Sequence, residues 1–156
     1  PFMKRITYWP QLFLGLTFNW GIIMAWTSIM NNISAEIIVL YLLAIFWTLG
    51  YDTIYGAQDL VDDEIIGNKS TSIKFKKNLK LFVSLCYLIC SILTVFLFNR
   101  LQVINYSAFF IAIFILSLIN QIKMFNKDNP KSCMNAFKSN NFSGAALFCG
   151  FILLNT

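Results

Sequence analysis

Residues 35–71 read AEIIVLYLLAIFWTLGYDTIYGAQDLVDDEIIGNKST, and this stretch indicates what kind of protein the chain forms. Its first 21 residues are almost entirely apolar, and a helix of that length crosses the hydrocarbon core of a bilayer. The apolar run leads into an acidic cluster that holds five of the seven acidic residues in the chain, Asp52, Asp59, Asp62, Asp63 and Glu64. Ionisable groups at the edge of a membrane segment cost free energy and mark a functional site. We therefore expect the chemistry of this protein at this helix end.

The composition is that of a membrane protein. The 156 residues are 58% hydrophobic and 12% charged, with a mean hydropathy of +0.66, whereas soluble domains are about 45–50% apolar and about 25% charged. Besides residues 35–55, apolar runs cover residues 11–30, 79–98, 103–122 and 142–154, of which the last is short. None alternates as barrel strands do. The sequence therefore predicts an all-α, polytopic transmembrane helix bundle with about five helices.

The basic residues predict the orientation of the bundle. If the five runs cross the membrane in alternating directions, eleven of the twelve Lys and Arg residues fall on one side, and only Arg100 falls on the other. The positive-inside rule places the crowded side, and with it the acidic cluster, in the cytoplasm. Because these residues lie between apolar runs and not in a solvated basic arm, we expect no nucleic-acid partner.

The absence of His and of any CxxC pair limits the chemistry further. The chain has no His and four Cys residues, so the usual zinc and redox motifs are excluded. Cys86 and Cys90 are four residues apart in an apolar run, and we interpret them as packing residues on one helix face.

The acidic cluster predicts a metal site. If the helix of residues 35–55 continues through it, Asp59 and Asp63 lie one turn apart on one face, and Asp52 points nearly the same way. Three stacked carboxylates with no basic residue four positions away suggest that a bound cation compensates their charge. An EF-hand is excluded, because position six from Asp59 is Glu64 and position twelve is Ser70. Mg²⁺ fits best, since one or two carboxylates and substrate phosphates usually hold it.

Residues after the cluster could bind the phosphates of such a substrate. Lys69, Ser70 and Thr71 follow directly and offer a charge and two hydroxyl groups. The alternative is a solvated acidic loop that keeps the helix end in water.

Three stretches also resemble a known family. YDTIYGAQDLVDDEIIGNKST, residues 51–71, closely resembles the second aspartate-rich motif of the UbiA-type prenyltransferases, especially of the branch that prenylates 4-hydroxybenzoate. PFMKRITYWPQLFLGLTFNWGIIMAW, residues 1–26, resembles the segment that opens the second half of these enzymes. NAFKSNNFSGAALFCG, residues 135–150, resembles their last helix. The resemblance covers nearly the whole chain.

The resemblance implies a fold, a reaction and a location. Members have nine transmembrane helices around a cavity that opens to the membrane, and two facing aspartate-rich motifs hold Mg²⁺ and the diphosphate of a polyprenyl diphosphate. The second motif, DxxxD, maps onto Asp59 and Asp63. The implied reaction joins the polyprenyl group to the ring of 4-hydroxybenzoate in ubiquinone biosynthesis. The implied location is the bacterial or the mitochondrial inner membrane.

The chain departs from the family pattern in one major respect, because it contains no NxxxDxxxD, the first motif. The resemblance then implies that residues 1–156 are the C-terminal part of a single membrane prenyltransferase domain, that the N-terminal half carries the first motif, and that this chain alone is inactive. Gly56 and Ser72 are smaller departures, since related sequences often carry Ala at both positions.

Several further residues keep two interpretations. Arg5 aligns with a basic residue that is important in the family, and it could bind the diphosphate or the substrate carboxylate; alternatively it is a positive-inside anchor like Lys4. Asp52 could be a third metal ligand or could orient a group in the site. Asn19 could serve helix packing or the substrate, and Asn140 with Asn141 would cap the last helix.

Two other functions remain open. One is transfer to another aromatic acceptor, such as the naphthoate of menaquinone synthesis. The other is a cation transporter, although transport sites lie near the bilayer midplane and these acids lie at its edge.

Overall fold

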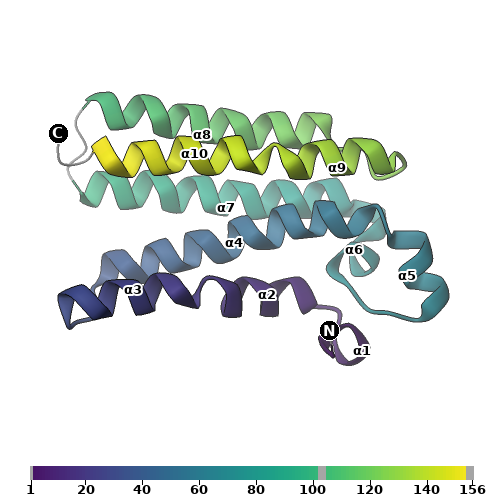
Figure 1. Cartoon of the computed structure of the whole chain (residues 1–156). Helices are drawn as coiled ribbons and strands as arrows, with labels where there is room; N and C mark the ends of the chain where they lie inside the picture. The colour runs from purple at the N-terminus through teal and green to yellow at the C-terminus, as the bar shows by residue number, and fades with distance from the viewer. Residues whose placement is uncertain (1, 102–104, 154–156) are drawn as a thin grey trace.

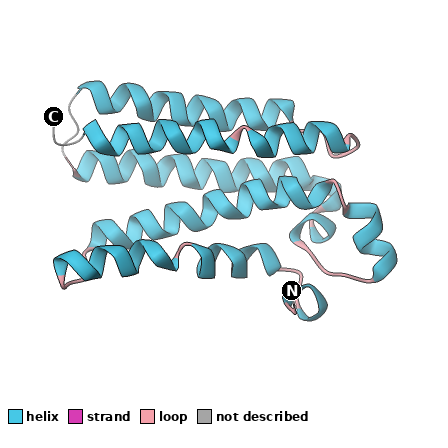
Figure 2. Cartoon of the chain, in the orientation of Figure 1, coloured by secondary structure: helices cyan, strands magenta, loops and turns pink. Residues whose placement is uncertain are grey.

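Helices make up nearly all of the chain. The computed structural model describes residues 2–101 and 105–153, and over these residues it contains helices and loops but no strand (Figure 2). In chain order the helices are α1 (Met3–Ile6), α2 (Pro10–Phe18), α3 (Trp20–Met30), α4 (Ala35–Ala57), α5 (Leu60–Ile66), α6 (Thr71–Lys74), the 3₁₀ helix η1 (Lys76–Asn78), α7 (Leu79–Arg100), α8 (Asn105–Met124), α9 (Pro130–Lys138) and α10 (Asn140–Ile152). The predicted all-α bundle is confirmed.

Four helical stretches are long and apolar enough to cross a membrane. They are Pro10–Met30, Ala35–Ala57, Lys76–Arg100 and Ser107–Met124, which match the first four predicted segments. The fifth segment contains α10, whose 13 residues are fewer than a crossing needs, so a fifth crossing stays a prediction. The predicted start of the fourth segment at residue 103 and the predicted end of the fifth at residue 154 lie outside the described residues.

The centre of the bundle is the packing of α4 on α7, with α2 and α3 along one side of α4 and with α8 and α10 beyond α7 (Figure 1). Leu43, Ile54 and Val83 are fully buried in this core. Gly50 allows the Tyr87 ring to lie directly against α4, because a Cβ at Gly50 would come within 2.6 Å of Tyr87 Cδ1. The α4–α7 pair is therefore a rigid support for the residues at the end of α4.

The span Pro10–Met30 is interrupted at Asn19, between α2 and α3. The Asn19 amide donates to the Gly15 carbonyl at 2.8 Å and to Thr48 Oγ1 of α4 at 2.9 Å. This residue therefore satisfies backbone groups at the interruption and ties it to α4. A role of Asn19 in helix packing is confirmed.

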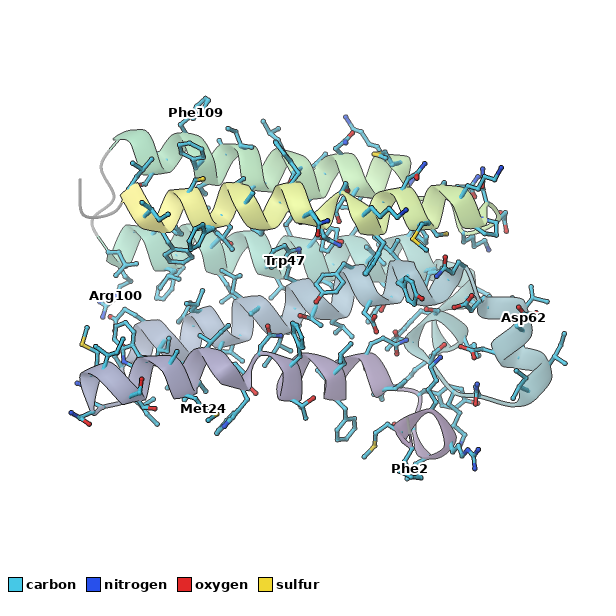
Figure 3. The ribbon with its side chains drawn as sticks, viewed as in Figure 1. Phe2, Met24, Trp47, Asp62, Arg100 and Phe109 are labelled. Carbon is cyan, nitrogen blue, oxygen red and sulfur yellow. The ribbon has the colours of Figure 1, made fainter. Side chains whose placement is uncertain are left out.

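Charged residues gather at one end of the bundle. α1, α5 and α6 lie at the end where α2, α7 and α9 begin (Figure 1), and most of the lysines lie on these segments or beside them. At the opposite end, Arg100 pairs with Glu36 at 3.5 Å, and Figure 3 shows Arg100 and Asp62 at opposite ends of the molecule. This distribution agrees with alternating crossings; which end faces the cytoplasm stays a prediction.

Candidate functional site

The helix that leads into the acidic cluster stops before the aspartates of the DxxxD motif. α4 ends at Ala57, and Asp59 precedes α5 with a non-helical backbone (φ −100°, ψ 12°). α5 then ends at Gly67, which adopts a left-handed conformation (φ 78°) that suits glycine. The prediction that one helix continues through the cluster and stacks Asp52 over Asp59 and Asp63 is therefore wrong. The reason lies in the sequence itself, since Asp is a poor helix former and like charges one turn apart repel.

Asp63 is the buried acid of the cluster, with 7% of its surface exposed. Lys4 Nζ lies 3.1 Å from its Oδ2, and Asn68 Nδ2 donates to its Oδ1 at 2.8 Å. The sequence has no basic residue four positions away from Asp63, and its basic partner in the structure is Lys4. Its partner comes from a segment 59 positions away in the sequence, where a search for neighbours on the same helix cannot find it.

The segment around α1 is attached to the loop after α5. Lys69 N–H donates to the Lys4 carbonyl at 2.6 Å, and Lys69 Nζ donates to the Ile6 carbonyl at 3.3 Å. Lys69 Nζ also lies 5.7 Å from the centre of the Tyr8 ring. The structure thereby holds Lys69 against the segment that carries Lys4 and Arg5, and Lys4 of this segment contacts Asp63.

Arg5 is exposed next to Lys4, and in the described part of the chain its guanidinium has no hydrogen bond or ion pair. An unpaired guanidinium can bind an anionic group in two-pronged fashion.

A buried polar floor lies under this segment. Gln11 Oε1 accepts from the Thr71 N–H at 3.0 Å, Thr71 Oγ1 lies 2.7 Å from Thr53 Oγ1, and Ser72 Oγ donates to the Thr53 carbonyl at 2.9 Å. Gly56 makes room for this contact, because a Cβ there would lie 2.8 Å from Ser72 Oγ. The loop after α5 is therefore fixed to α4 by side chains that satisfy each other's polar groups.

Ser70 and Asp52 have different surroundings from those predicted. Ser70 is buried, and its Oγ caps α6 by accepting from the Ile73 N–H at 3.2 Å. This capping role is structural, and a phosphate contact from Ser70 stays a prediction. Asp52 lines a hollow of about 400 Å³ together with Lys4 and Gln11, so it lies on the Lys4 side of the site and not in a stack with Asp59.

The other acids of the cluster are exposed. Glu64 pairs with Lys76 at 2.7 Å, and Asp62 points away from the bundle (Figure 3). Asp59 is exposed, and no partner for its carboxylate is found in the residues that the structure describes. Within residues 2–101 and 105–153, no three or more His, Cys, Asp and Glu side chains are grouped to hold a metal.

The sequence did not predict three residues of this site, and a cap predicted elsewhere, at Asn140, is wrong. Lys4 was interpreted as an anchor, and Gln11 and Asn68 were not considered. The only sequence feature that could have pointed to Lys4, Gln11 and Asn68 is that they are polar residues near an apolar run. This feature does not identify their contact partners. Asn140 does not cap α10, whose N-cap position is held by Ser139; instead its Oδ1 accepts from Trp47 Nε1 at 3.1 Å and from Gln121 Nε2 at 3.0 Å.

Comparison with known proteins identifies the family. Residues 1–149 match the sequence profile of the UbiA prenyltransferase family. The chain belongs to the UbiA prenyltransferase family.

Several relatives of this UbiA-family chain have names that describe an activity. It is 40% identical to the mitochondrial 4-hydroxybenzoate polyprenyltransferase of Aedes aegypti, over 98% of this chain and 35% of the relative. It is 40% identical to the human protein of the same name, over 99% of this chain and 42% of the relative. It is 38% identical to the 4-hydroxybenzoate octaprenyltransferase of Psychromonas ingrahamii, over 98% of this chain and 53% of the relative. The chain thus spans about a third to a half of these relatives. No solved structure matches it.

Proposed function

We propose that this chain is the C-terminal part of a membrane enzyme that transfers a polyprenyl group from polyprenyl diphosphate to the ring of 4-hydroxybenzoate, a step of ubiquinone biosynthesis. The names of the relatives and the match to residues 1–149 support this proposal. The structural observation that carries it is the contact of Lys4 with Asp63 at 3.1 Å. This contact places the acids of α5 beside the basic segment of α1, as a site for both a cation and a diphosphate requires.

The donor groups present fit Mg²⁺ in kind and number. Asp59 and Asp63 would hold the ion, and their backbones are joined by a hydrogen bond from Asp63 N–H to the Asp59 carbonyl at 2.8 Å. Two carboxylates are the usual protein contribution to a Mg²⁺ site that substrate phosphates complete. When bound, Mg²⁺ supplies Lewis-acid stabilisation of the leaving diphosphate.

The basic residues of this chain would act on the same leaving group. Lys4 offsets the charge of Asp63 before substrate binds, and Arg5 and Lys69 stabilise the negative charge that develops on the diphosphate as the allylic C–O bond breaks. The ring carbon ortho to the phenol hydroxyl then attacks the allylic carbocation. The new C–C bond forms, the ring loses a proton, and diphosphate leaves with the electrons of the broken bond.

An upstream half is part of this proposal. Outside the acidic cluster this chain has only Glu36 and Asp128 as acids, so in this proposal the first aspartate-rich motif, NxxxDxxxD, comes from the upstream half. We expect this chain alone to be inactive, and we expect activity when the upstream half is present.

The test is prenyl transfer by the protein with its upstream half, in membranes, with polyprenyl diphosphate, Mg²⁺ and either 4-hydroxybenzoate or a dihydroxynaphthoate. We expect transfer to 4-hydroxybenzoate that requires Mg²⁺. Asp59→Ala and Asp63→Ala should each lower kcat at least ~100-fold, which corresponds to about 2.7 kcal/mol of barrier. Asp62→Ala is the matched control, since Asp62 is on the same helix but points away, and it should retain activity.

Other results would change the assignment. Preference for the naphthoate would retain the reaction and change the acceptor. If Asp59→Ala and Asp63→Ala each retained wild-type activity, Asp59 and Asp63 would not be the metal ligands. Cation flux in liposomes that is lost in Asp59→Asn, with no prenyl transfer, would favour a transporter.

A further inference from the structure

A hollow of about 590 Å³ lies at the charged end of the bundle, where α7 begins and α8 ends (Figure 1). Four lysines line it: Lys77 of η1, Lys80 in the first turn of α7, Lys123 in the last turn of α8 and Lys127 in the loop that follows. We call it the lysine hollow. Both helices are long and apolar enough to cross a membrane, so the hollow lies where two crossings reach the membrane surface.

The charges around the lysine hollow are not balanced. All four lysines are exposed, and within residues 2–101 and 105–153 none of them pairs with a carboxylate. Asp128 is the one acid among the described residues that line the hollow. Like charges gathered around one hollow repel each other, and an anion with more than one negative charge would relieve this repulsion.

The wall that carries Lys127 is held in place. Lys127 Nζ donates to the Lys76 carbonyl at 3.3 Å, which ties the loop after α8 to the start of α7. The same loop is tied to α9, because Asn126 N–H donates to Ser132 Oγ at 3.0 Å and Ser132 Oγ donates to the Asn126 carbonyl at 2.9 Å. An ammonium group has three N–H donors, so Lys127 keeps two for a ligand.

Exposed apolar side chains continue from the hollow along both helices. On α7 they follow at spacings of one turn: Leu81, which lines the hollow and is 59% exposed, and then Leu85, Leu88 and Ile92. On α8 the exposed Ile119 and Leu116 lie one and two turns before Lys123, on the same face. The surface therefore joins a basic head-group site to apolar tracks that run into the bilayer.

This surface lies away from the acids that face the upstream half in the proposed enzyme. Asp63 and Lys4 meet beside α2, on one side of α4, whereas α7 packs on α4 and α8 lies beyond α7 (Figure 1). The placement of the upstream half rests on the proposed function, but the hollow and its lysines do not depend on it.

We propose that the lysine hollow binds the head group of an anionic phospholipid, with its phosphates among the four ammonium groups and its acyl chains along the exposed faces of α7 and α8. Basic pockets between transmembrane helices on the cytoplasmic side bind such head groups, and the positive-inside rule assigns this end to the cytoplasm. Topology explains each lysine singly, but it does not require a hollow shared by two helices. Cardiolipin, with two phosphates, matches four ammonium groups better than a lipid with one.

The test is lipid binding by the protein with its upstream half, purified in a neutral detergent. The protein is titrated with cardiolipin or phosphatidylcholine, and bound lipid is counted by native mass spectrometry. We expect cardiolipin to bind at least ~10-fold more tightly than phosphatidylcholine. The double variant Lys80→Gln/Lys123→Gln should weaken cardiolipin binding at least ~10-fold, which corresponds to about 1.4 kcal/mol, with the lipid-free melting temperature unchanged.

The matched control is Lys131→Gln/Lys138→Gln, which removes the same charge from exposed positions of α9 that do not line the hollow. It should weaken cardiolipin binding less than ~2-fold. Equal weakening by both double variants would show diffuse attraction to a basic surface and overturn the site.

Two further probes separate the lipid from other phosphates. Inorganic diphosphate has the charge but no chains, and it should displace little cardiolipin; full displacement would show a site for free anions and overturn the lipid. Tighter binding of polyprenyl diphosphate than of cardiolipin, lost in Lys80→Gln/Lys123→Gln, would overturn it in favour of a substrate site. None of these measurements uses prenyl transfer, so failure of the proposed function would leave their results unchanged.

Discussion

Lys4 Nζ lies 3.1 Å from Asp63 Oδ2, and this ion pair joins the beginning of the chain to the helix that follows α4. The lysine is about half exposed, with 43% of its side chain accessible, whereas only 9% of the aspartate side chain is accessible. The pair therefore compensates a nearly buried carboxylate, which without a partner would be costly to keep ionised.

Lys4→Met should destabilise the protein by about 1–2 kcal/mol, because it leaves the Asp63 carboxylate without its charged donor. If Asp63 binds Mg²⁺, added Mg²⁺ should recover part of this loss. Melting temperatures in detergent with and without Mg²⁺ would measure both effects.

Lys76→Met is the matched control for Lys4→Met. Lys76 pairs with Glu64 at 2.7 Å, but both side chains are exposed, and such pairs contribute about 0–1 kcal/mol. Equal losses in the two variants, with no effect of Mg²⁺ on either, would contradict a special role for Lys4 and Asp63.

Gly56 and Ser72 should be energetically coupled. In the wild-type background, Gly56→Ala gains helix propensity but forces Ser72 Oγ away from the Thr53 carbonyl, because the new Cβ would lie 2.8 Å from it. In a Ser72→Ala background the hydroxyl is gone and only Gln11 Nε2, at 3.3 Å from the new Cβ, remains in tight contact. Gly56→Ala should then destabilise less than in the wild type, or stabilise by up to about 1 kcal/mol. A double-mutant cycle should give a coupling of about 1 kcal/mol or more; strict additivity would show that the loop moves to accommodate the methyl group.

Gly50→Ala should destabilise the bundle by about 1–3 kcal/mol, because its Cβ overlaps the buried Tyr87 ring. The ring cannot retreat easily, since its hydroxyl is bonded to Gln121. Gly21→Ala is the control, as nothing lies within 4 Å of its new Cβ, and it should be neutral or stabilise slightly. Unfolding in a denaturing detergent would compare the two, and equal stability of both variants would contradict the tight α4–α7 contact.

Gln121→Leu should destabilise the protein by about 2–3 kcal/mol, because it leaves the buried Tyr87 hydroxyl without an acceptor and removes donors to Asn140 and Ser143. Asn120→Leu changes the neighbouring exposed amide and should have little effect. Thermal unfolding of the pair would measure the network, and a mild Gln121→Leu would mean that the network contributes little to the stability of the fold.

Most of the membrane-spanning helices, but only part of the candidate site, could be predicted from the sequence. It predicted five crossings, and four of them match long apolar helices because each depends on an unbroken apolar run; the fifth stays a prediction. It located the acids because they are absent almost everywhere else. The prediction that the helix of residues 35–55 continues through the acidic cluster was wrong. Asp52 lies on α4, but Asp63 lies on a separate helix, α5. The sequence also failed for Asn140, whose position before an apolar run suggested a cap, although its partners are Trp47 and Gln121.

The sequence by itself determined the all-helical membrane fold, the family, and the end of the bundle at which the acids gather, because composition and local spacing control these features. Only the tertiary structure decided which residues meet. Lys4 reaches Asp63 across 59 positions, and Trp47 reaches Asn140 across 93. Such contacts depend on the relative rotation and height of packed helices, which are set by close approaches such as that of Gly50 to Tyr87. No pattern within one segment carries that information, because it belongs to the surfaces of two helices at once.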